Sequence, residues 1–366
     1  MIPESQLHAT LGRHNLEHVR IIPLPQVSPQ LQSLYESWIQ AGFHGAMEYL
    51  KRHTHLKYQP QGLLAEARSL IQVVLPYYRF RRQEKLTPGQ GRIARYAWGR
   101  DYHKVLKKRL TAVCRELSEQ FPGENFRAFV DSGPLDERYY AERAGFGGQG
   151  RNGLLIHPHY GSWIFLGEIL TTIAVEPAFS PEPERKPENR PSEQPLDGPG
   201  SICPKGCSNC RKKCPTGALR ADGRFDARHC ISYLTIEHPG GIPVEMRPLI
   251  GDRLFGCDIC QEVCPLNHRV PETGETDFLN NIAGEALELS AVLRIRRREE
   301  MVELYAGSPL MRLGVEQLLR NAAIVAANTG AAHLLPEIQE LSTHPNPMVA
   351  EHADWAMERL RQFLEP

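Results

Sequence analysis

The distribution of cysteines constrains this chain more than any other feature. Eight of its nine cysteines lie between residues 203 and 264, and only Cys114 lies outside that stretch. A disulfide scaffold requires an oxidising compartment, and nothing in the sequence points to one. Clustered thiols in a reducing cytosol are typical of metal ligands. We therefore expect the middle of the chain to fold around metal.

Two runs of cysteines have the spacing of iron–sulfur ligands. The pattern C-x2-C-x3-C-P occurs twice, ending at Pro215 and Pro265, and Cys230 lies between the two runs. In two-cluster ferredoxins the cysteine before the proline ligates the other cluster. The spacing therefore predicts two [4Fe–4S] clusters, with Cys203, Cys207, Cys210 and Cys264 as ligands of the first and Cys214, Cys230, Cys257 and Cys260 as ligands of the second.

The first run departs from the usual ferredoxin pattern. Three residues separate Cys203 from Cys207, where two are usual, and Gly206 makes the longer loop feasible. A pair of zinc sites is the alternative, since C-x2-C is also zinc spacing. The two Cys-Pro endings and the eight thiols favour iron–sulfur clusters, with about eight irons per chain.

Helix and strand signals alternate before the cysteine segment. Residues 1–175 predict an α/β N-terminal domain in a chain of the α+β class. Its expected helices cover 29–40 and 135–144, with a third that Asp101 caps, and its expected strands cover 69–78, 126–131, 153–157 and 162–174.

Composition divides the rest of the chain. Residues 176–200 are rich in proline and glutamate and predict an exposed linker. Residues 201–275 form the predicted two-cluster module. Residues 280–366 carry helical patterns at 315–326, 332–341 and 347–364, which favour stacked helical repeats.

Charge and hydropathy limit the partners. The chain has 43 Lys+Arg and 43 Asp+Glu, so any nucleic-acid site must be a local basic patch. No apolar run is long enough to span a membrane, and the first residues do not resemble a secretory signal. A cytoplasmic protein with no membrane partner is expected. Because two clusters only move electrons, the large N-terminal domain favours a reductase over a simple electron carrier.

Short motifs outside the cysteines resemble those of the epoxyqueuosine reductases, which are cobalamin-dependent iron–sulfur enzymes of tRNA modification. The matching runs are Met47–Leu50, Arg95–Ala97, Gly99–His103, Val130–Pro134, Gly161–Trp163, Phe165–Glu168, Cys230–Glu237 and Gly256–Cys260. They follow one another in the family's order over about residues 45–270. The C-terminal helices resemble the family's HEAT-like repeats.

The resemblance implies a cofactor and a reaction. Base-off cobalamin would lie between the N-terminal domain and the ferredoxin-like module and receive electrons from the clusters. The reaction would remove the epoxide oxygen of epoxyqueuosine at the wobble position of a tRNA with a queuosine-type anticodon. An unidentified low-potential donor would supply the electrons, and a monomer is expected.

Asp131 corresponds to the family's proton donor. An epoxide oxygen is a poor leaving group unless it is protonated. Asp131 ends an apolar strand, where partial burial is expected to raise its pKa towards that of a usable acid. The alternative is that Asp131 caps the helix after Pro134.

Other residues are candidates for cofactor contacts. The expected cobalamin-binding residues are Lys57, Asp131, Arg151, Asn152, Cys257 and Asp258. Lys57 has the alternative of a solvated charge at a helix end. His103 lies in a sequence similar to a cobalt-ligating histidine motif, but the motif's glycine is missing, so we interpret His103 as structural. Residues 145–151 lack the tryptophan and lysine of the usual family sequence.

Basic residues beside the first cysteine run are candidates for tRNA binding. The expected tRNA contacts are Lys205, Arg211, Lys212, Lys213 and His238. For a second basic cluster, at residues 294–298, a solvated charged face is favoured over tRNA binding more strongly than it is for the first cluster. Two other functions remain open, namely a corrinoid reductase of a small molecule, such as a halogenated compound, and an electron carrier without a substrate.

Overall fold

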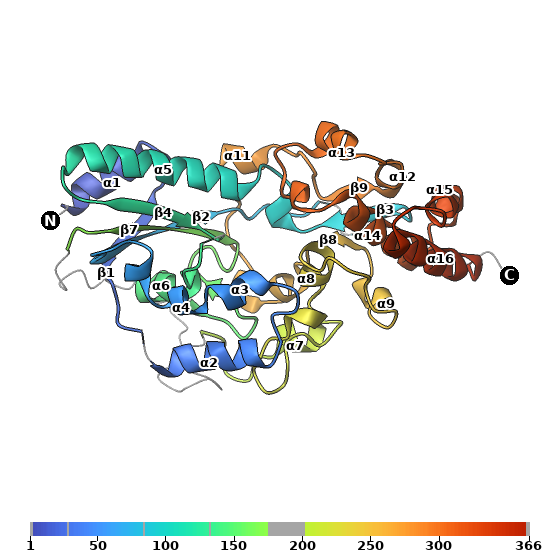
Figure 1. The fold of residues 1–366 in the computed structure, drawn as a ribbon, viewed down its shortest axis with the longest axis horizontal. Coiled ribbons are helices and arrows are strands. Elements are labelled where there is room, and N and C mark those ends of the chain that lie inside the picture. Colours follow the sequence, from blue (N-terminus) through green and yellow to red (C-terminus); the bar gives the residue numbers. More distant parts are fainter. Residues whose placement is uncertain (1–2, 28, 83–84, 132, 175–201, 364–366) are drawn as a thin grey trace.

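The computed structural model describes residues 3–27, 29–82, 85–131, 133–174 and 202–363 (Figure 1). The predicted linker 176–200 lies outside the described residues. The strands are β1 (His18–Pro23), β2 (Ser69–Pro76), β3 (Gln90–Ile93), β4 (Phe126–Val130), β5 (Gly148–Gln149), β6 (Leu155–Ile156), β7 (Ile164–Thr171), β8 (Arg253–Phe255) and β9 (Ala286–Glu288).

The helices of the first half are α1 (Glu4–Gly12), α2 (Pro29–Gln40), α3 (Glu48–Arg52), α4 (Thr54–Lys57), α5 (Tyr102–Gln120) and α6 (Glu137–Arg143). Those of the second half are α7 (Asn209–Lys213), α8 (Ile231–Ile236), α9 (Arg247–Ile250), α10 (Ile259–Glu262), α11 (Thr276–Leu279), α12 (Leu289–Leu293), α13 (Arg298–Tyr305), α14 (Val315–Asn328), α15 (Leu335–Leu341) and α16 (Pro347–Arg361). Each of the six helices predicted from the sequence is present, namely α2, α5, α6, α14, α15 and α16, and the described residues form further helices that were not predicted.

A four-stranded sheet forms the centre of the N-terminal half. Its order is β1-β2-β7-β4, and every neighbouring pair is antiparallel. Strand β2 is buried on both faces because helices cover both sides. Ile71 and Val73 point to the core under α1 and α5, whereas Leu70 and Val74 point to the core under α6 (Figure 1). The predicted α+β class is confirmed, but the prediction of an α/β N-terminal domain is corrected, because its sheet has no parallel strand pair.

Helix α5 lies very close to this sheet at Gly167. A Cβ atom at Gly167 would lie 2.8 Å from Leu110 Cδ1 and 3.0 Å from Leu106 Cδ2. Glycine therefore lets the long helix pack directly on β7. Asp101 caps the helix as predicted, since its side chain accepts a hydrogen bond from the His103 backbone N–H. This contact fixes the start of α5 beside the end of β4.

A second sheet joins the three predicted units. Strand β3, from the N-terminal range, pairs in parallel with β8 of the cysteine-rich range and antiparallel with β9 near the C-terminal helices. One hydrophobic core contains Trp98, Phe255 and Leu319 together. The domain boundaries stay a prediction. The three predicted units, however, share this hydrophobic core.

Helices α14, α15 and α16 pack on one another at the C-terminal end (Figure 1). Their assignment to the HEAT-like class stays a prediction. No helix in the described ranges combines the length and apolar character needed to cross a membrane.

Arg320 connects this helical unit to the cysteine-rich module. It lies in α14, is 0% exposed, and donates hydrogen bonds to the backbone carbonyls of Leu234, His238 and Gly240. Burial lowers its pKa to about 10. Asn321, the next residue, donates to the carbonyls of Thr235 and Leu254 at 2.8 and 3.1 Å. Helix α14 therefore satisfies backbone groups of the module that holds the cysteines.

Replacing Arg320 with leucine should destabilise the protein by about 3 kcal/mol, because three buried carbonyls lose their donors. Urea denaturation of Arg320→Leu against the wild type measures this loss. Arg361→Leu, at an exposed position of α16, is the matched control and should change stability by less than about 0.5 kcal/mol. Equal losses in the two variants would contradict the assigned role of Arg320.

Candidate functional site

The eight clustered cysteines come together in two sets. Burial raises the pKa of Cys264, and the thiols of Cys203, Cys207 and Cys210 raise it further. Burial likewise raises the pKa of Cys257 to about 12, with Cys230 contributing. These interactions require each thiol to lie near the others of its set.

The thiols of the second set also interact with one another. Cys260 interacts with Cys257 and Cys230, and Cys230 interacts with Cys214. The two sets approach each other where Cys210 faces Cys260. The members of each set are those that the sequence rule predicts as ligands of one cluster, so the thiols present fit two [4Fe–4S] groups. A zinc site would need its ligands around one ion, and in the described part of the chain no three His, Cys, Asp or Glu side chains are arranged in that way.

Asp131 follows the last residue of β4 and is the centre of a hydrogen-bonded network. Its side chain is 41% exposed. Its Oδ2 accepts a hydrogen bond from the Tyr102 hydroxyl and lies 2.8 Å from His103 Nε2. Arg312 Nη1 lies 3.8 Å from the same oxygen. Two donors from the start of α5 and one cation from the C-terminal half therefore meet at this carboxylate.

The network reverses the predicted effect on the Asp131 pKa. Desolvation alone would raise it, but the hydrogen bonds from His103 and Tyr102 and the nearby positive charges lower the pKa of Asp131 to about 2. The expectation that partial burial raises this pKa was therefore wrong. The helix-cap alternative was wrong as well, because Asp136 caps α6 by accepting a hydrogen bond from the Tyr139 N–H.

His103, which we predicted to be structural, belongs to the hydrogen-bonded network of Asp131. Its Nδ1 lies 2.8 Å from Asp101 Oδ1, and its Nε2 faces Asp131. Desolvation lowers the pKa of His103, but the hydrogen bonds to the two carboxylates outweigh it, and the pKa is raised from its usual value. An imidazolium can donate one N–H to each carboxylate. Arg312 Nη1 lies 3.0 Å from His103 Nε2. Its positive charge lowers the pKa of His103, but the net result is still a raised pKa.

Two adjacent cavities open at Asp131. The larger, of ≈ 230 Å³, has an apolar wall that includes Tyr96, Phe165 and Leu166. The smaller, of ≈ 150 Å³, includes Lys57. Asp131, Glu137 and Arg138 line both.

The walls of these cavities suit a flat, largely apolar ligand. The rings of Tyr102 and Phe165 stack at 4.0 Å with an interplanar angle of 4°, and Tyr77 stacks on Phe165 from 4.3 Å. The three rings give an aromatic wall, with Asp131 at one end and Gln261 and Ser162 beside Tyr77 at the other. Such a surface fits a macrocycle with an apolar face and a polar edge, so the residues present are compatible with cobalamin.

Glu137 is the second carboxyl group of these cavities. Burial raises the pKa of Glu137 well above its usual value, and the negative charge of Asp131 adds to the effect. Nearby Glu168, buried in β7, has its pKa raised to about 8 by burial. The site therefore combines one carboxylate of lowered pKa with two carboxyl groups of raised pKa.

Lys57 is half-buried in the smaller cavity. Its side chain is 13% exposed, with Nζ 3.9 Å from Asp136 Oδ2 and 4.8 Å from the centre of the Tyr35 ring. Burial lowers its pKa. The alternative of a solvated helix-end charge was therefore wrong.

Arg151 and Asn152 lie elsewhere. The Arg151 backbone N–H donates to Cys203 Sγ at 3.2 Å, and its guanidinium donates to the Cys207 carbonyl. Asn152 is buried and accepts a hydrogen bond from the Leu154 N–H at 3.3 Å. Neither residue lines the two cavities at Asp131, and a contact with cobalamin stays a prediction for both. Arg151 instead joins the altered loop 145–151 to the first cysteine run.

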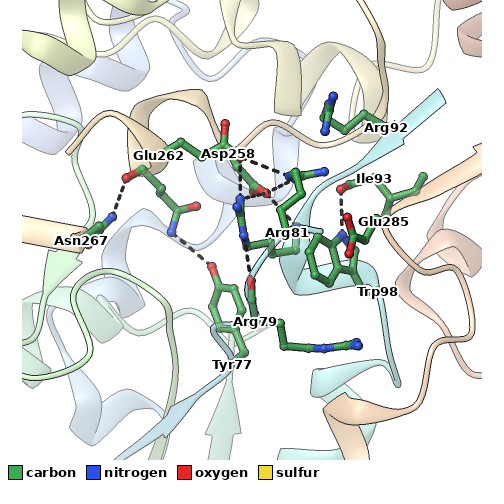
Figure 2. Close-up of polar contacts among 12 residues, drawn as sticks. Tyr77, Arg79, Arg81, Arg92, Ile93, Trp98, Asp258, Glu262, Asn267 and Glu285 are labelled. Atoms are coloured by element: carbon green, nitrogen blue, oxygen red, sulfur yellow. Dashed lines mark hydrogen bonds and ion pairs between the residues drawn. The ribbon is translucent and has the colours of Figure 1, made fainter. Parts of the chain in front are cut away.

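Asp258 is buried among arginines beside the second cysteine run. Its Oδ2 lies 3.1 Å from Arg81 Nη2 and 3.2 Å from Arg95 Nη1, and it accepts the Arg95 backbone N–H (Figure 2). Three residues further along, Gln261 reaches the wall of the larger Asp131 cavity, where it donates to the Tyr77 hydroxyl. The segment Cys257–Cys264 therefore borders that cavity.

The predicted tRNA contacts divide into two groups. Lys205, Lys212 and Lys213 are exposed on and beside α7, and Arg211 is half-buried. His238 is half-buried, and its Nε2 lies 3.0 Å from the Gly241 carbonyl. Arginines of the basic cluster at 294–298 form ion pairs with glutamates of α15. Arg294 pairs with Glu337 and Arg296 with Glu340, both at 2.7 Å. This pairing agrees with a solvated charged face.

Sequence reasoning missed three members of the Asp131 network. Tyr102 and His103 lie inside a motif that we noted, but without an indication that they face Asp131. Arg312 is 209 positions after His103 and carried no sequence signal. Only the packing of the C-terminal half onto the N-terminal half brings it to the site.

Comparisons with known proteins place the chain among enzymes of one kind. Residues 57–132 match the family described as "Epoxyqueuosine reductase QueG, DUF1730", and residues 203–267 match the "4Fe-4S double cluster binding domain". The chain is 38% identical over 332 residues to the epoxyqueuosine reductase of Pseudomonas aeruginosa, covering 88% of this chain and 86% of that protein. It is 36% identical over 337 residues to that of Escherichia coli, covering 91% and 83%.

Solved structures agree with the sequence comparison. An epoxyqueuosine reductase crystallised with a tRNA-Tyr epoxyqueuosine-modified stem loop superposes with a TM-score of 0.84 at 28% identity, covering 98% of this chain and 90% of that one. The Bacillus subtilis enzyme, in a structure with its catalytic aspartate loop swung out of the active site, superposes with a TM-score of 0.83 at the same identity and coverage.

Replacing Asp131 with asparagine should lower the pKa of His103, because the imidazolium loses a facing carboxylate. Titration of His103 by ¹⁵N NMR in wild type and Asp131→Asn measures this. The His103 pKa is raised and the Asp131 pKa is lowered on folding, so the stability that this pair adds is full between about pH 4 and about pH 6.5. It is lost as pH rises through the folded pKa of His103 and as pH falls through the folded pKa of Asp131. An unchanged His103 titration in the variant would show that the two side chains are not paired in solution.

Proposed function

The chain belongs to the epoxyqueuosine reductase family, and on that premise we propose that it reduces epoxyqueuosine to queuosine at the wobble position of a tRNA anticodon. The reaction takes up two electrons and two protons and releases the epoxide oxygen as water. The observation that carries the proposal is that Asp131 and Gln261, which lies between Cys260 and Cys264, line one cavity. A proton site and a cluster-bearing segment therefore border the same space.

The cofactors in this proposal are two [4Fe–4S] clusters and cobalamin. The clusters would be held by the two sets of four thiols. Bound cobalamin would supply a strongly reducing cobalt centre for the epoxide. The aromatic wall formed by Tyr96, Tyr102 and Phe165 would hold its face, and Lys57 lies where a polar edge group would bind. Contacts of Arg151, Asn152, Cys257 and Asp258 with the cofactor remain part of the proposal.

The chain's own residues supply the proton. Asp131 carries no proton near neutral pH, because its pKa is about 2. His103 lies 2.8 Å from it and holds a proton more strongly than an ordinary histidine. We infer that Asp131 passes the His103 proton to the epoxide oxygen, while Arg312 and Tyr102 fix the carboxylate. Asp131 is then the catalytic residue and His103 the positioning and proton-holding residue.

The partners follow from the same arrangement. The exposed lysines Lys205, Lys212 and Lys213 beside the first cysteine run are available for tRNA phosphates. A monomer remains part of the proposal. An electron carrier without a substrate of its own would leave the Asp131 network without a role, and a small-molecule reductase would not need the exposed lysines.

Removing one thiol from either set should remove one cluster. Cys210→Ser and Cys260→Ser should each lower the iron content of anaerobically reconstituted protein from about eight to about four atoms per chain. Iron and sulfide analysis measures this. Cys114→Ser, on helix α5 and outside both sets, is the control and should keep full iron. Stoichiometric zinc without sulfide in the wild type would refute the cluster assignment.

Asp131→Asn should lower kcat by at least about 100-fold, the usual contribution of a general acid. His103→Gln should lower it less, by about tenfold, because loss of the hydrogen bond from His103 raises the pKa of Asp131 and lets this carboxyl group hold a proton itself. Mass spectrometry of nucleosides from tRNA isolated from a deletion strain and treated with each variant and dithionite measures the conversion. The cobalamin absorbance of each variant controls for cofactor binding.

The wild-type rate should fall as pH rises through the raised pKa of His103, because the imidazolium is lost. His103→Gln should lose this part of the pH profile. Near wild-type conversion by Asp131→Asn with bound cofactor would defeat the assignment of the acid. Absence of epoxyqueuosine in the tRNA of the deletion strain would defeat the proposed function itself.

A further inference from the structure

A second, larger cavity lies beside the cysteine-rich module and has no part in the chemistry described above. Its volume is ≈ 570 Å³. Of the described residues that line it, only Gln261 also lines the larger Asp131 cavity. We call it the arginine cavity, because its walls include Arg81, Arg92, Arg95, Arg253 and Arg269.

The arginine cavity has more positive than negative charge. Arg95 and Arg81 pair with buried Asp258 and with Glu262, and Arg92 pairs with Asp252 at 2.9 Å. These three carboxylates do not balance five guanidinium groups. The excess positive charge suits an anionic partner.

Arg81 forms part of the inner wall of this cavity. Its side chain is 7% exposed and is held between Asp258 and the ring of Trp98 (Figure 2). The Nη1 atom of Arg81 is buried and has no hydrogen-bond partner among the described residues. Because this atom is enclosed, Arg81 acts on a partner through its charge and not through a direct hydrogen bond.

Aromatic side chains accompany the arginines. Phe80 is 59% exposed and Tyr78 is half-buried, whereas Trp163, 1% exposed, belongs to the closed inner wall of the same cavity. Arginines and aromatic residues together are typical of the energetically important centre of a protein–protein interface. A free inorganic anion would leave the exposed Phe80 ring uncovered.

The cavity lies along the segment that holds the predicted cluster ligands. Glu262 and Gln261 lie between Cys260 and Cys264, and Arg269 follows Cys264 by five positions. Cys257 itself lines a small adjoining space together with Arg81 and Arg253. A partner seated here therefore covers the loop that carries ligands of both sets.

We propose that the arginine cavity is the docking site of an acidic one-electron carrier protein that reduces the clusters. This rests on the proposed function, because that reaction consumes electrons. In each docking event the carrier loses one electron and one cluster changes from the 2+ to the 1+ state, so two events serve one epoxide. The protons come from the Asp131 side and not from the carrier. Because the two cavities share only Gln261, the carrier and the tRNA nucleoside approach by different routes.

The test measures cluster reduction in the reconstituted holoenzyme by stopped flow. A photoreduced, acidic [2Fe–2S] ferredoxin is the electron source. Arg269→Glu should lower the second-order rate constant about tenfold at low salt, and the difference should shrink at about 0.5 M salt as charges are screened. Phe80→Ser should weaken binding of the oxidised ferredoxin without changing the salt dependence. Arg115→Glu, on an exposed position of α5, is the matched control and should behave as wild type.

Dithionite separates docking from chemistry. Reduction by dithionite and dithionite-driven conversion of tRNA should be unchanged in Arg269→Glu and Phe80→Ser. Wild-type rates with ferredoxin in both variants would overturn the proposal. Loss of tRNA affinity in Arg269→Glu, with ferredoxin reduction intact, would also overturn it and make the cavity an RNA site. Failure of wild-type protein to convert tRNA with dithionite would instead count against the proposed function.

Discussion

The gathering of eight thiols into two sets of four is the constraint on which the rest of the structure depends. The rule that each Cys-Pro cysteine belongs to the other set forces residues 203–214 and 257–264 to lie face to face, with Cys230 between them. Strand β8 lies immediately before Cys257 and pairs with β3 from the N-terminal half, which holds the second cysteine run in place. The cysteine-rich module is therefore fixed to the N-terminal half by backbone hydrogen bonds, and to the C-terminal half by Arg320 and Asn321 of α14.

That junction also creates the site. The C-terminal ends of β2 and β4 lie at the same end of the antiparallel sheet, so Tyr77 and Asp131 border one cavity with Gln261 of α10. The start of α5 supplies Tyr102 and His103, and Arg312 arrives from the C-terminal half. Catalytic chemistry of the proposed kind needs a proton next to the reacting oxygen. The structure supplies it through a paired carboxylate and imidazolium rather than through an isolated buried acid.

Two cavities that share Gln261 differ in their electrostatics. On one side, carboxyl groups with altered pKa values surround Asp131. On the other side, arginines surround Asp258, and their charge is only partly neutralised. The Cys257–Cys264 segment borders both sides. In our proposals an electron carrier would approach one side and the tRNA nucleoside the other, and neither would block its counterpart.

The sequence by itself determined the local features. The spacing of the cysteines predicted the two thiol sets, apolar runs predicted β2 and β4, and Asp101 was correctly identified as the cap of α5, because each of these depends on neighbours within a few residues. Only the tertiary structure decided the pairing of His103 with Asp131, the arrival of Arg312, and hence the pKa of the carboxylate. It also decided that the N-terminal sheet is antiparallel and that Lys57 is half-buried. Hydrogen bonds need donor and acceptor within about 3 Å, and charge effects weaken with distance, so the protonation of Asp131 depends on atoms that distant parts of the chain bring together, and no local pattern encodes them.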